Sequence, residues 1–401
     1  TSDYRWSERW TSNSAVALGF WVALLLLFTF VGWPWVRLLF PRAPDGGTGL
    51  ARTMTLIIAG WLMWFLASLK IIIFSSVWSW VCLAATAIVG WVLWWTLADR
   101  KRHFPKLVIS GAEIAFWLFF ALFLFYRWVN PDSWHPSWGG EKPMEFAHLN
   151  ATLRSANFPP FDPWFSDGYI NYYYYGLYLV AYAIKLTGIP AEIAFNLAQP
   201  TIMGMMASCA YSLAAALSAG RTRKWQATIT GLCAAVLLAL IGNLFEFVNV
   251  LKTWPAEIRP YFGLWFWDPS RAITGTITEF PYFTGTYADL HAHGINVPNT
   301  LVLLALLLTL ARDPWLTALG ASRPRNRKNL ANLIVRLGVT GLLVGTVATT
   351  NSWDAAEYIA FLAVGMFMTT LYVRPFPMRL LVTAIGTGIA GFIALATFAP
   401  F

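Results

Sequence analysis

Side chains suited to acid–base chemistry are concentrated in residues 139–177, between long apolar tracts. Glu141 and Glu145 are four residues apart, so on a helix they share a face. Two carboxylates beside an apolar surface can have their pKa values driven apart, which suits general acid–base work. A solvated loop whose charges cap a helix is the alternative, and spacing alone slightly favours it.

Two further polar segments follow, YADLHAHGI at 287–295 and NSWDAAE at 351–357. In the first, Asp289, His291 and His293 alternate, so an extended chain would project them to one side, as a metal site requires. Two histidines are too few to name a metal. A hydrogen-bonded loop cluster without an ion is at least as well supported.

Composition indicates a membrane protein. Mean hydropathy is +0.56 and only 12% of the 401 residues are charged, while many apolar runs exceed the length needed to cross a bilayer. The net charge of +9 sits in short clusters between these runs, which indicates topology and argues against a nucleic-acid partner. Cys82, Cys209 and Cys233 lie in apolar runs and are interpreted as buried hydrophobes.

The charge clusters predict a topology. The basic run at 99–103 is expected to be cytoplasmic, which places loops 130–191 and 252–295 outside. The tyrosine-rich run 170–188 is short, and a full crossing there would put the polar loop 252–295 inside. We therefore expect it to lie in the outer leaflet without crossing.

The fold expected is an all-α polytopic transmembrane helical bundle with about ten spanning helices plus outer-leaflet juxtamembrane helices. The spanning helices are predicted at 14–40, 53–75, 76–98, 107–129, 192–219, 226–251, 296–312, 331–350, 355–373 and 380–399. Since the chain starts at Thr1 without Met, we expect it to be a piece of a longer protein.

Three motifs carry a family resemblance: EKPMEFAHLNATLRSANFPPFDPWFSDGYINYYYYGLY, TEFPYFTGTYADLHAH and TNSWDAAEY. They resemble the Chlor-Arch-YYY membrane-protein family, which is similar to the GT-C glycosyltransferase superfamily. The resemblance covers residues 107–401 and leaves 1–106 as an N-terminal three-helix region. One departure is Glu145, where Asp is more familiar in the family.

The resemblance implies transfer of a sugar from a lipid-linked phosphate donor to an acceptor hydroxyl, with inversion. Glu141 or Glu145 would act as general base. Lys142, Arg154 or a divalent metal held by Asp289, His291 and His293 would offset charge on the leaving phosphate. The residues expected to contact substrate are Lys142, His148, Asn150, Arg154, Asp167, Tyr172, Tyr173, Tyr174, Asn351 and Asp354. An interfacial anchor is the favoured alternative for the tyrosine run.

The implied location is the plasma membrane of a prokaryote, with the polar loops extracytoplasmic. The implied partners are membrane lipids and a polyprenyl-phosphate-linked sugar. A competing hypothesis is a non-catalytic integral membrane subunit that packs against partner membrane subunits or binds lipid.

Overall fold

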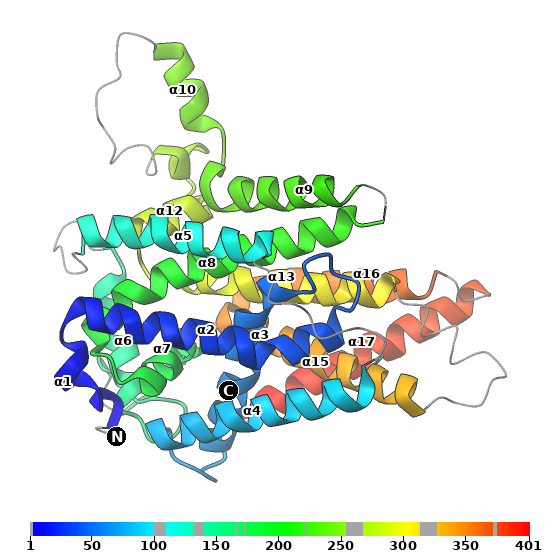
Figure 1. Ribbon diagram of the computed structural model, residues 1–401, viewed down its shortest axis with the longest axis horizontal. Helices are drawn as coiled ribbons and strands as arrows, with labels where there is room; N and C mark the ends of the chain where they lie inside the picture. Colours follow the sequence, from blue (N-terminus) through cyan, green and yellow to red (C-terminus); the bar gives the residue numbers. More distant parts are fainter. Residues whose placement is uncertain are drawn as a thin grey trace.

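The computed structural model describes residues 3–98, 110–131, 140–165, 167–171, 174–220, 223–253, 268–312, 327–371 and 375–401. Within these ranges the chain forms helices and one isolated antiparallel bridge, Phe161 with Tyr169, and no strand. Most long helices run along a common axis (Figure 1). The α-helices are α1 (Glu8–Thr11), α2 (Ser14–Leu39), α3 (Ala51–Ser68), α4 (Ser76–Leu97), α5 (Gly111–Val129), α6 (Lys142–Arg154), α7 (Tyr174–Thr187), α8 (Ala191–Ser218), α9 (Lys224–Val236), α10 (Phe245–Thr253), α12 (Pro281–Tyr287), α13 (Ala292–Arg312), α15 (Arg327–Thr350), α16 (Ala355–Thr369) and α17 (Phe376–Phe398). Short helical turns are η1 (Asp3–Arg5), η2 (Thr48–Leu50), η3 (Leu237–Ile241), η4 (Asp268–Arg271) and η5 (Ser352–Asp354).

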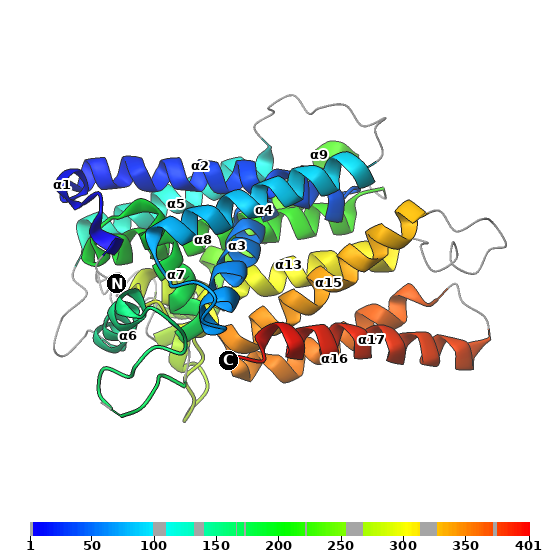
Figure 2. The ribbon, with the colours of Figure 1, turned by 90° about the horizontal axis from the view of Figure 1, so that it is seen from below.

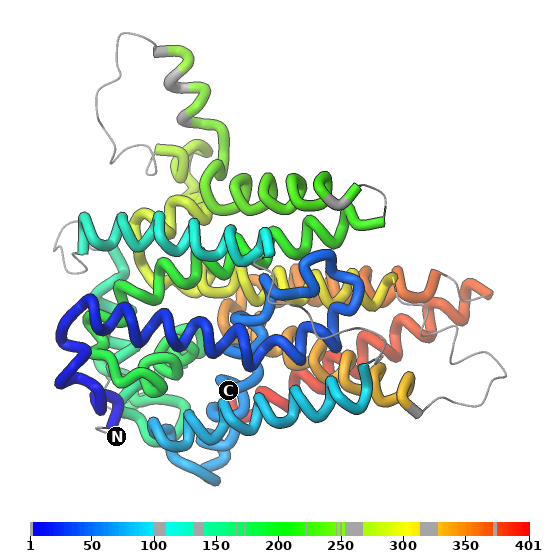
Figure 3. Tube along the Cα trace, in the orientation of Figure 1, coloured from blue at the N-terminus to red at the C-terminus, as the bar shows by residue number. Residues whose placement is uncertain are grey.

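Among the described residues, eight helices are long and apolar enough to cross a membrane, namely α2, α3, α4, α5, α8, α13, α15 and α17. The all-α membrane bundle is therefore confirmed, and eight of the roughly ten predicted spans have this length and hydropathy within the described residues. The predicted helix 226–251 breaks at Gly242, whose φ of 54° ends η3, and α10 then turns away from the bundle (Figure 3). The other expected span, α16, has only 15 residues.

The long helices run side by side between two ends of the bundle (Figure 2), and side-chain hydrogen bonds join neighbouring segments at each end. At one end Arg42 Nη1 donates to the carbonyl of Arg312 at 2.6 Å, and Arg312 Nη2 donates to that of Leu217 at 3.0 Å. At the other end Asn296 Nδ2 donates to Asp354 Oδ2 at 2.7 Å, which joins α13 to η5. The candidate residues on α6 and at the start of α13 lie at this second end. Which membrane face each end meets stays a prediction.

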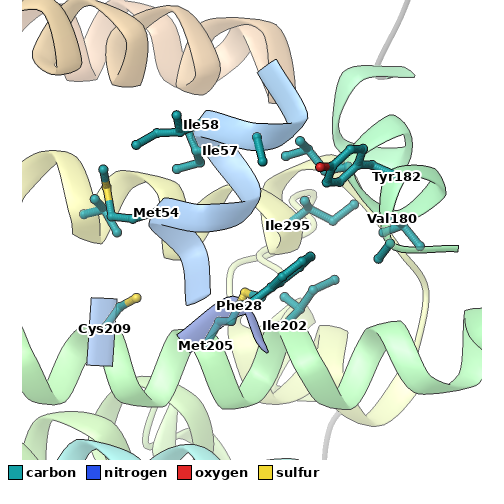
Figure 4. Packing of buried hydrophobic residues seen from close by; sticks show 14 of the residues in the cluster. Phe28, Met54, Ile57, Ile58, Val180, Tyr182, Ile202, Met205, Cys209 and Ile295 are labelled. Atoms are coloured by element: carbon teal, nitrogen blue, oxygen red, sulfur yellow. The ribbon is translucent and has the colours of Figure 1, made fainter. Parts of the chain in front are cut away.

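The core of the bundle encloses α7. All 14 residues of this helix are buried, and Val180 and Tyr182 pack in one cluster with Phe28, Ile202 and Ile295 from α2, α8 and α13 (Figure 4). At about 1.5 Å per residue, α7 is ~21 Å long, shorter than the ~30 Å hydrocarbon core of a bilayer. It is thus a short helix held inside the bundle by longer ones.

A buried ion pair joins three of the long helices. Arg52 of α3 donates two hydrogen bonds to the carboxylate of Glu113 on α5, at 3.1 and 2.8 Å, and its Nε donates to the carbonyl of Leu25 on α2. The guanidinium carbon also lies 3.9 Å from the ring centroid of Phe116. Every part of this buried cation therefore has a partner, which offsets its desolvation.

We expect Glu113→Ala to lower the free energy of unfolding by about 3–5 kcal/mol, because it leaves the buried Arg52 without its counter-ion. Thermal unfolding in detergent micelles measures the effect. The double variant Glu113→Ala, Arg52→Met should recover much of the loss. Glu192→Ala is the control, since its pair with Arg5 is solvent-exposed and contributes at most about 1 kcal/mol. Equal stability of Glu113→Ala and the native chain would contradict this role.

Candidate functional site

The first part of the site is the start of α6. Glu141 is the residue before its first turn, and Pro143 lies in that turn, where its missing N–H costs no hydrogen bond. Gly140 has a φ of 59°, and a Cβ there would lie 2.5 Å from the ring of Tyr287. Glycine therefore permits both the turn and the close approach of α12.

The second part is the turn between α12 and α13, which a carboxylate of α6 holds in place. Glu145 is buried, and its Oε2 accepts a hydrogen bond from the amide of Leu290 at 2.6 Å. Lys142 Nζ donates to the carbonyl of Tyr287 at 2.8 Å and lies 4.4 Å from the centroid of its ring. Two side chains of α6 thus bind the backbone of this turn.

A chain of hydrogen bonds crosses the site. Glu141 Oε2 lies 2.9 Å from His291 Nε2, and the Nδ1 atoms of His291 and His293 are 2.8 Å apart. His293 Nε2 lies 3.2 Å from Glu279 Oε2 and 3.0 Å from Thr284 Oγ1. Because both nitrogens of each imidazole face a partner, the two rings are fixed between two carboxylates.

Buried charge sets the electrostatics of the site. The hydrogen bond with His291 lowers the pKa of Glu141, whose side chain is 53% exposed. Burial lowers the pKa of His291, but the hydrogen bond and charge of Glu141 outweigh it, so the pKa is raised overall. Glu141 is therefore an ionised carboxylate at neutral pH, with a partly charged imidazole beside it.

The pKa values of the buried carboxylates Glu145 and Asp289 are raised, in contrast to that of Glu141. Burial, reinforced by Asp289, raises the pKa of Glu145 well above its ordinary value. Burial, reinforced by Glu279, raises the pKa of Asp289 to about 7. Within the described chain, Glu145 Oε1 and Asp289 Oδ1 have no hydrogen-bond partner. Burial likewise raises the pKa of Glu279, so one site holds a carboxylate that favours ionisation and three that resist it.

The arrangement does not fit a metal ion. In the described part of the chain, no three His, Cys, Asp or Glu side chains are placed so that they could hold one. The nitrogens of His291 and His293 face each other and the carboxylates of Glu141 and Glu279 instead of converging on a shared point. The alternation of Asp289, His291 and His293 therefore gives a hydrogen-bonded cluster here.

A small pocket opens between α6 and the turn. It is lined by Glu141, Met144, Glu145, His148, Leu177, Leu290, His291 and Ala292. Glu141, Glu145, His148 and His291, which were singled out from the sequence, thus share one pocket, with Lys142 and Asp289 beside it.

Other predicted contacts lie elsewhere. Asn150 donates to the carbonyl of Phe146 within α6, while Arg154 is exposed at the far end of that helix and Asp167 is exposed in a loop. Asn351 is buried at the end of α15, and Asp354 accepts the hydrogen bond from Asn296. None of these five residues lines the pocket, so their positions do not support contact with a molecule held inside it.

The tyrosine run belongs to the core where the structure describes it. Tyr174 is 1% exposed, its hydroxyl accepts a hydrogen bond from Trp64 Nε1 at 3.1 Å, and its ring stacks on that of Phe401. The predicted substrate contact of Tyr174 is corrected to a packing role, because no face of its ring is free. Tyr172 and Tyr173 lie outside the described residues.

Sequence reasoning did not single out Glu279, Thr284 or Gln199. Glu279 and Thr284 contact His293, and Gln199 of α8 donates to the carbonyl of Thr284 at 3.0 Å. Glu279 and Thr284 lie in the TEFPYFTG segment just before the histidines, and their position in that motif could have indicated them. No pattern in the sequence indicates the contact of Gln199.

The fold and the site define an all-α integral membrane protein with a carboxylate–imidazole cluster at one end of its bundle. The chain belongs to the family of uncharacterized membrane proteins described as DUF2298, which matches residues 58–401. The match begins within α3 and includes every residue of the pocket, whereas α2 precedes it. Comparison with curated proteins and with solved structures found no match.

We predict that Asp289→Asn makes the protein more stable than the native chain above pH 7. In the folded state the pKa of Asp289 is raised, so the native chain loses stability as pH rises from about 4 to about 7, whereas Asn stays neutral. Melting temperatures of both proteins across this range measure the difference, with the exposed Asp167→Asn as control. Parallel curves for the native chain and Asp289→Asn would contradict the prediction.

Proposed function

We propose that this protein transfers a sugar from a lipid-linked phosphate donor to an acceptor hydroxyl. The observation that carries the proposal is the meeting of Glu141 with His291 in a pocket at one end of the bundle, beside the buried Glu145 and Asp289. A carboxylate and an imidazole in one pocket, with a buried lysine beside it, are groups that suit such a transfer. The resemblance to GT-C glycosyltransferases favours the same reaction.

Glu141 is the general base in this proposal. It is the carboxylate of the site that is exposed to a pocket and held ionised, since His291 lowers its pKa. Its free oxygen takes the proton of the acceptor hydroxyl as that oxygen bonds to the anomeric carbon. The bond between this carbon and the phosphate oxygen breaks with inversion, and its electron pair leaves on the lipid phosphate.

Glu145 has a different role, although sequence reasoning treated the two glutamates alike. Its pKa is raised by burial and one of its oxygens is committed to the amide of Leu290. Because this carboxyl is buried and bound to the turn, Glu145 positions the segment that carries His291. No step uses a metal, because the described arrangement does not fit one.

Lys142 and His291 supply the positive charge for the leaving phosphate. Lys142 is the first residue of α6 and directly follows Glu141, and His291 contacts Glu141 directly. Developing negative charge in a partly buried pocket is stabilised strongly by such fixed cations. Arg154, the other cation expected to help, is at the opposite end of α6 and is left out.

The proposed setting is the outer face of a prokaryotic plasma membrane. The eight helices long enough to span a bilayer in the described part of the chain support membrane embedding. The basic cluster Arg42–Arg312 lies at the end of the bundle away from the pocket, and the positive-inside rule places that end in the cytoplasm. The pocket would then lie at the depth of outer-leaflet headgroups, where a lipid-linked phosphate is found.

We expect Glu141→Gln to lower the rate of transfer about 100-fold or more, since the base that takes the acceptor proton is lost. The assay reconstitutes purified protein in liposomes with a polyprenyl-phosphate-linked radiolabelled hexose and follows release of the lipid phosphate. Glu192→Gln, a glutamate whose partner Arg5 is exposed, is the matched control and should retain activity.

Full transfer by Glu141→Gln at normal expression would contradict the proposal. A native chain that binds partner membrane proteins but consumes no donor would instead favour the non-catalytic subunit. The observation that favours this alternative is the exposure of α17. Only 11% of its apolar stretch is buried, so most of its surface can contact lipid or a partner protein.

A further inference from the structure

The segment that connects α6 to α7 forms a hairpin that extends from the bundle (Figure 2). We call residues 160–165 and 167–170 the aromatic hairpin. Its two arms are joined by hydrogen bonds from Asp162 N to the carbonyl of Gly168 at 3.0 Å and from Ile170 N to that of Pro160 at 2.8 Å. Asp162 Oδ1 also accepts from the amides of Trp164 at 2.8 Å and of Phe165 at 3.2 Å, which holds residues 162–165 in a turn.

Four large aromatic side chains of this hairpin face outward. Phe161, Trp164, Phe165 and Tyr169 are 61%, 63%, 66% and 54% exposed. The rings of Phe161 and Tyr169 stack with centroids 4.8 Å apart, and the ring of Phe165 covers Gly168. The rings therefore form an aromatic surface on a segment that does not span the membrane, and such surfaces mark binding sites.

The aromatic surface reaches the pocket through one contact. The ring of Trp164 meets the ring of His148 edge-on, with centroids 5.3 Å apart. His148 lines the pocket together with Glu141 and Glu145. A molecule that reacts at Glu141 and extends past His148 would therefore lie along Trp164.

We propose that the aromatic hairpin binds the pyranose rings of a carbohydrate acceptor, an inference that rests on the proposed function. Aromatic faces pack against the C–H faces of sugar rings, and the carboxylates of Asp162 and Asp167 beside them are acceptors for sugar hydroxyls. The same two carboxylates disfavour the other apolar environment, the bilayer, because insertion of the tip would carry both into lipid. The chemistry of the hairpin thus matches a sugar chain better than a membrane.

The test measures carbohydrate binding in the absence of any donor. Native protein in nanodiscs is titrated with maltotriose, cellotriose and mannotriose, and the dissociation constant is read by saturation-transfer NMR. We expect at least one trisaccharide to bind, with Trp164→Ala and Tyr169→Ala each weakening it about tenfold, as for aromatic residues central to an interface. Trp225→Ala, an exposed tryptophan on α9, is the matched control and should bind like the native chain.

Two results would overturn the proposal. One is that no trisaccharide binds, or that the hairpin variants bind as tightly as the native chain while their melting temperatures show normal folding. The other is that a fluorophore on Phe165→Cys is quenched by brominated lipid, which would assign the hairpin to the bilayer. Because no donor is present, neither result depends on transfer, which the Glu141 assay tests separately.

Discussion

The hydrogen bond from the amide of Leu290 to the buried carboxylate of Glu145 is the constraint on which the site depends. It joins residues 145 positions apart in the sequence. A buried carboxylate is costly unless it is neutralised or hydrogen-bonded, and here the amide bond and the raised pKa both reduce that cost. With the turn fixed to α6, His291 is brought to Glu141 and His293 to Glu279. The acid–base character of the pocket follows from this one connection.

Much of this arrangement could be predicted because it depends on local patterns. Apolar runs of sufficient length predicted the spanning helices, and i,i+4 spacing placed Glu141 and Glu145 on one side of α6. Alternating basic and polar clusters predicted which helix ends lie together, as the contacts of Arg42 with Arg312 and of Asn296 with Asp354 show.

What the sequence could not supply are properties that arise only from packing between distant segments. A run of tyrosines can lie on a surface or in a core. Tyr174 belongs to the core because Trp64 and Phe401, which are distant in the sequence, pack against it. The carboxylates at 141 and 145 acquire opposite pKa shifts because a hydrogen bond with His291 lowers the pKa of Glu141, whereas burial, reinforced by Asp289, raises that of Glu145. The helix break at Gly242 depends on the positive φ of this one residue. The surrounding sequence is largely apolar and therefore predicted one continuous helix.

The claim that is most open to direct test is that residues 141 and 291 meet at one end of the bundle. Cysteines at both positions, in a chain whose Cys82, Cys209 and Cys233 are replaced by alanine, would be treated with a short bismaleimide in membranes. The account predicts an intrachain crosslink between 141 and 291, and none for a pair at 141 and 328, at opposite ends of the bundle. Absence of the first crosslink, while each single cysteine still reacts with maleimide, would contradict it.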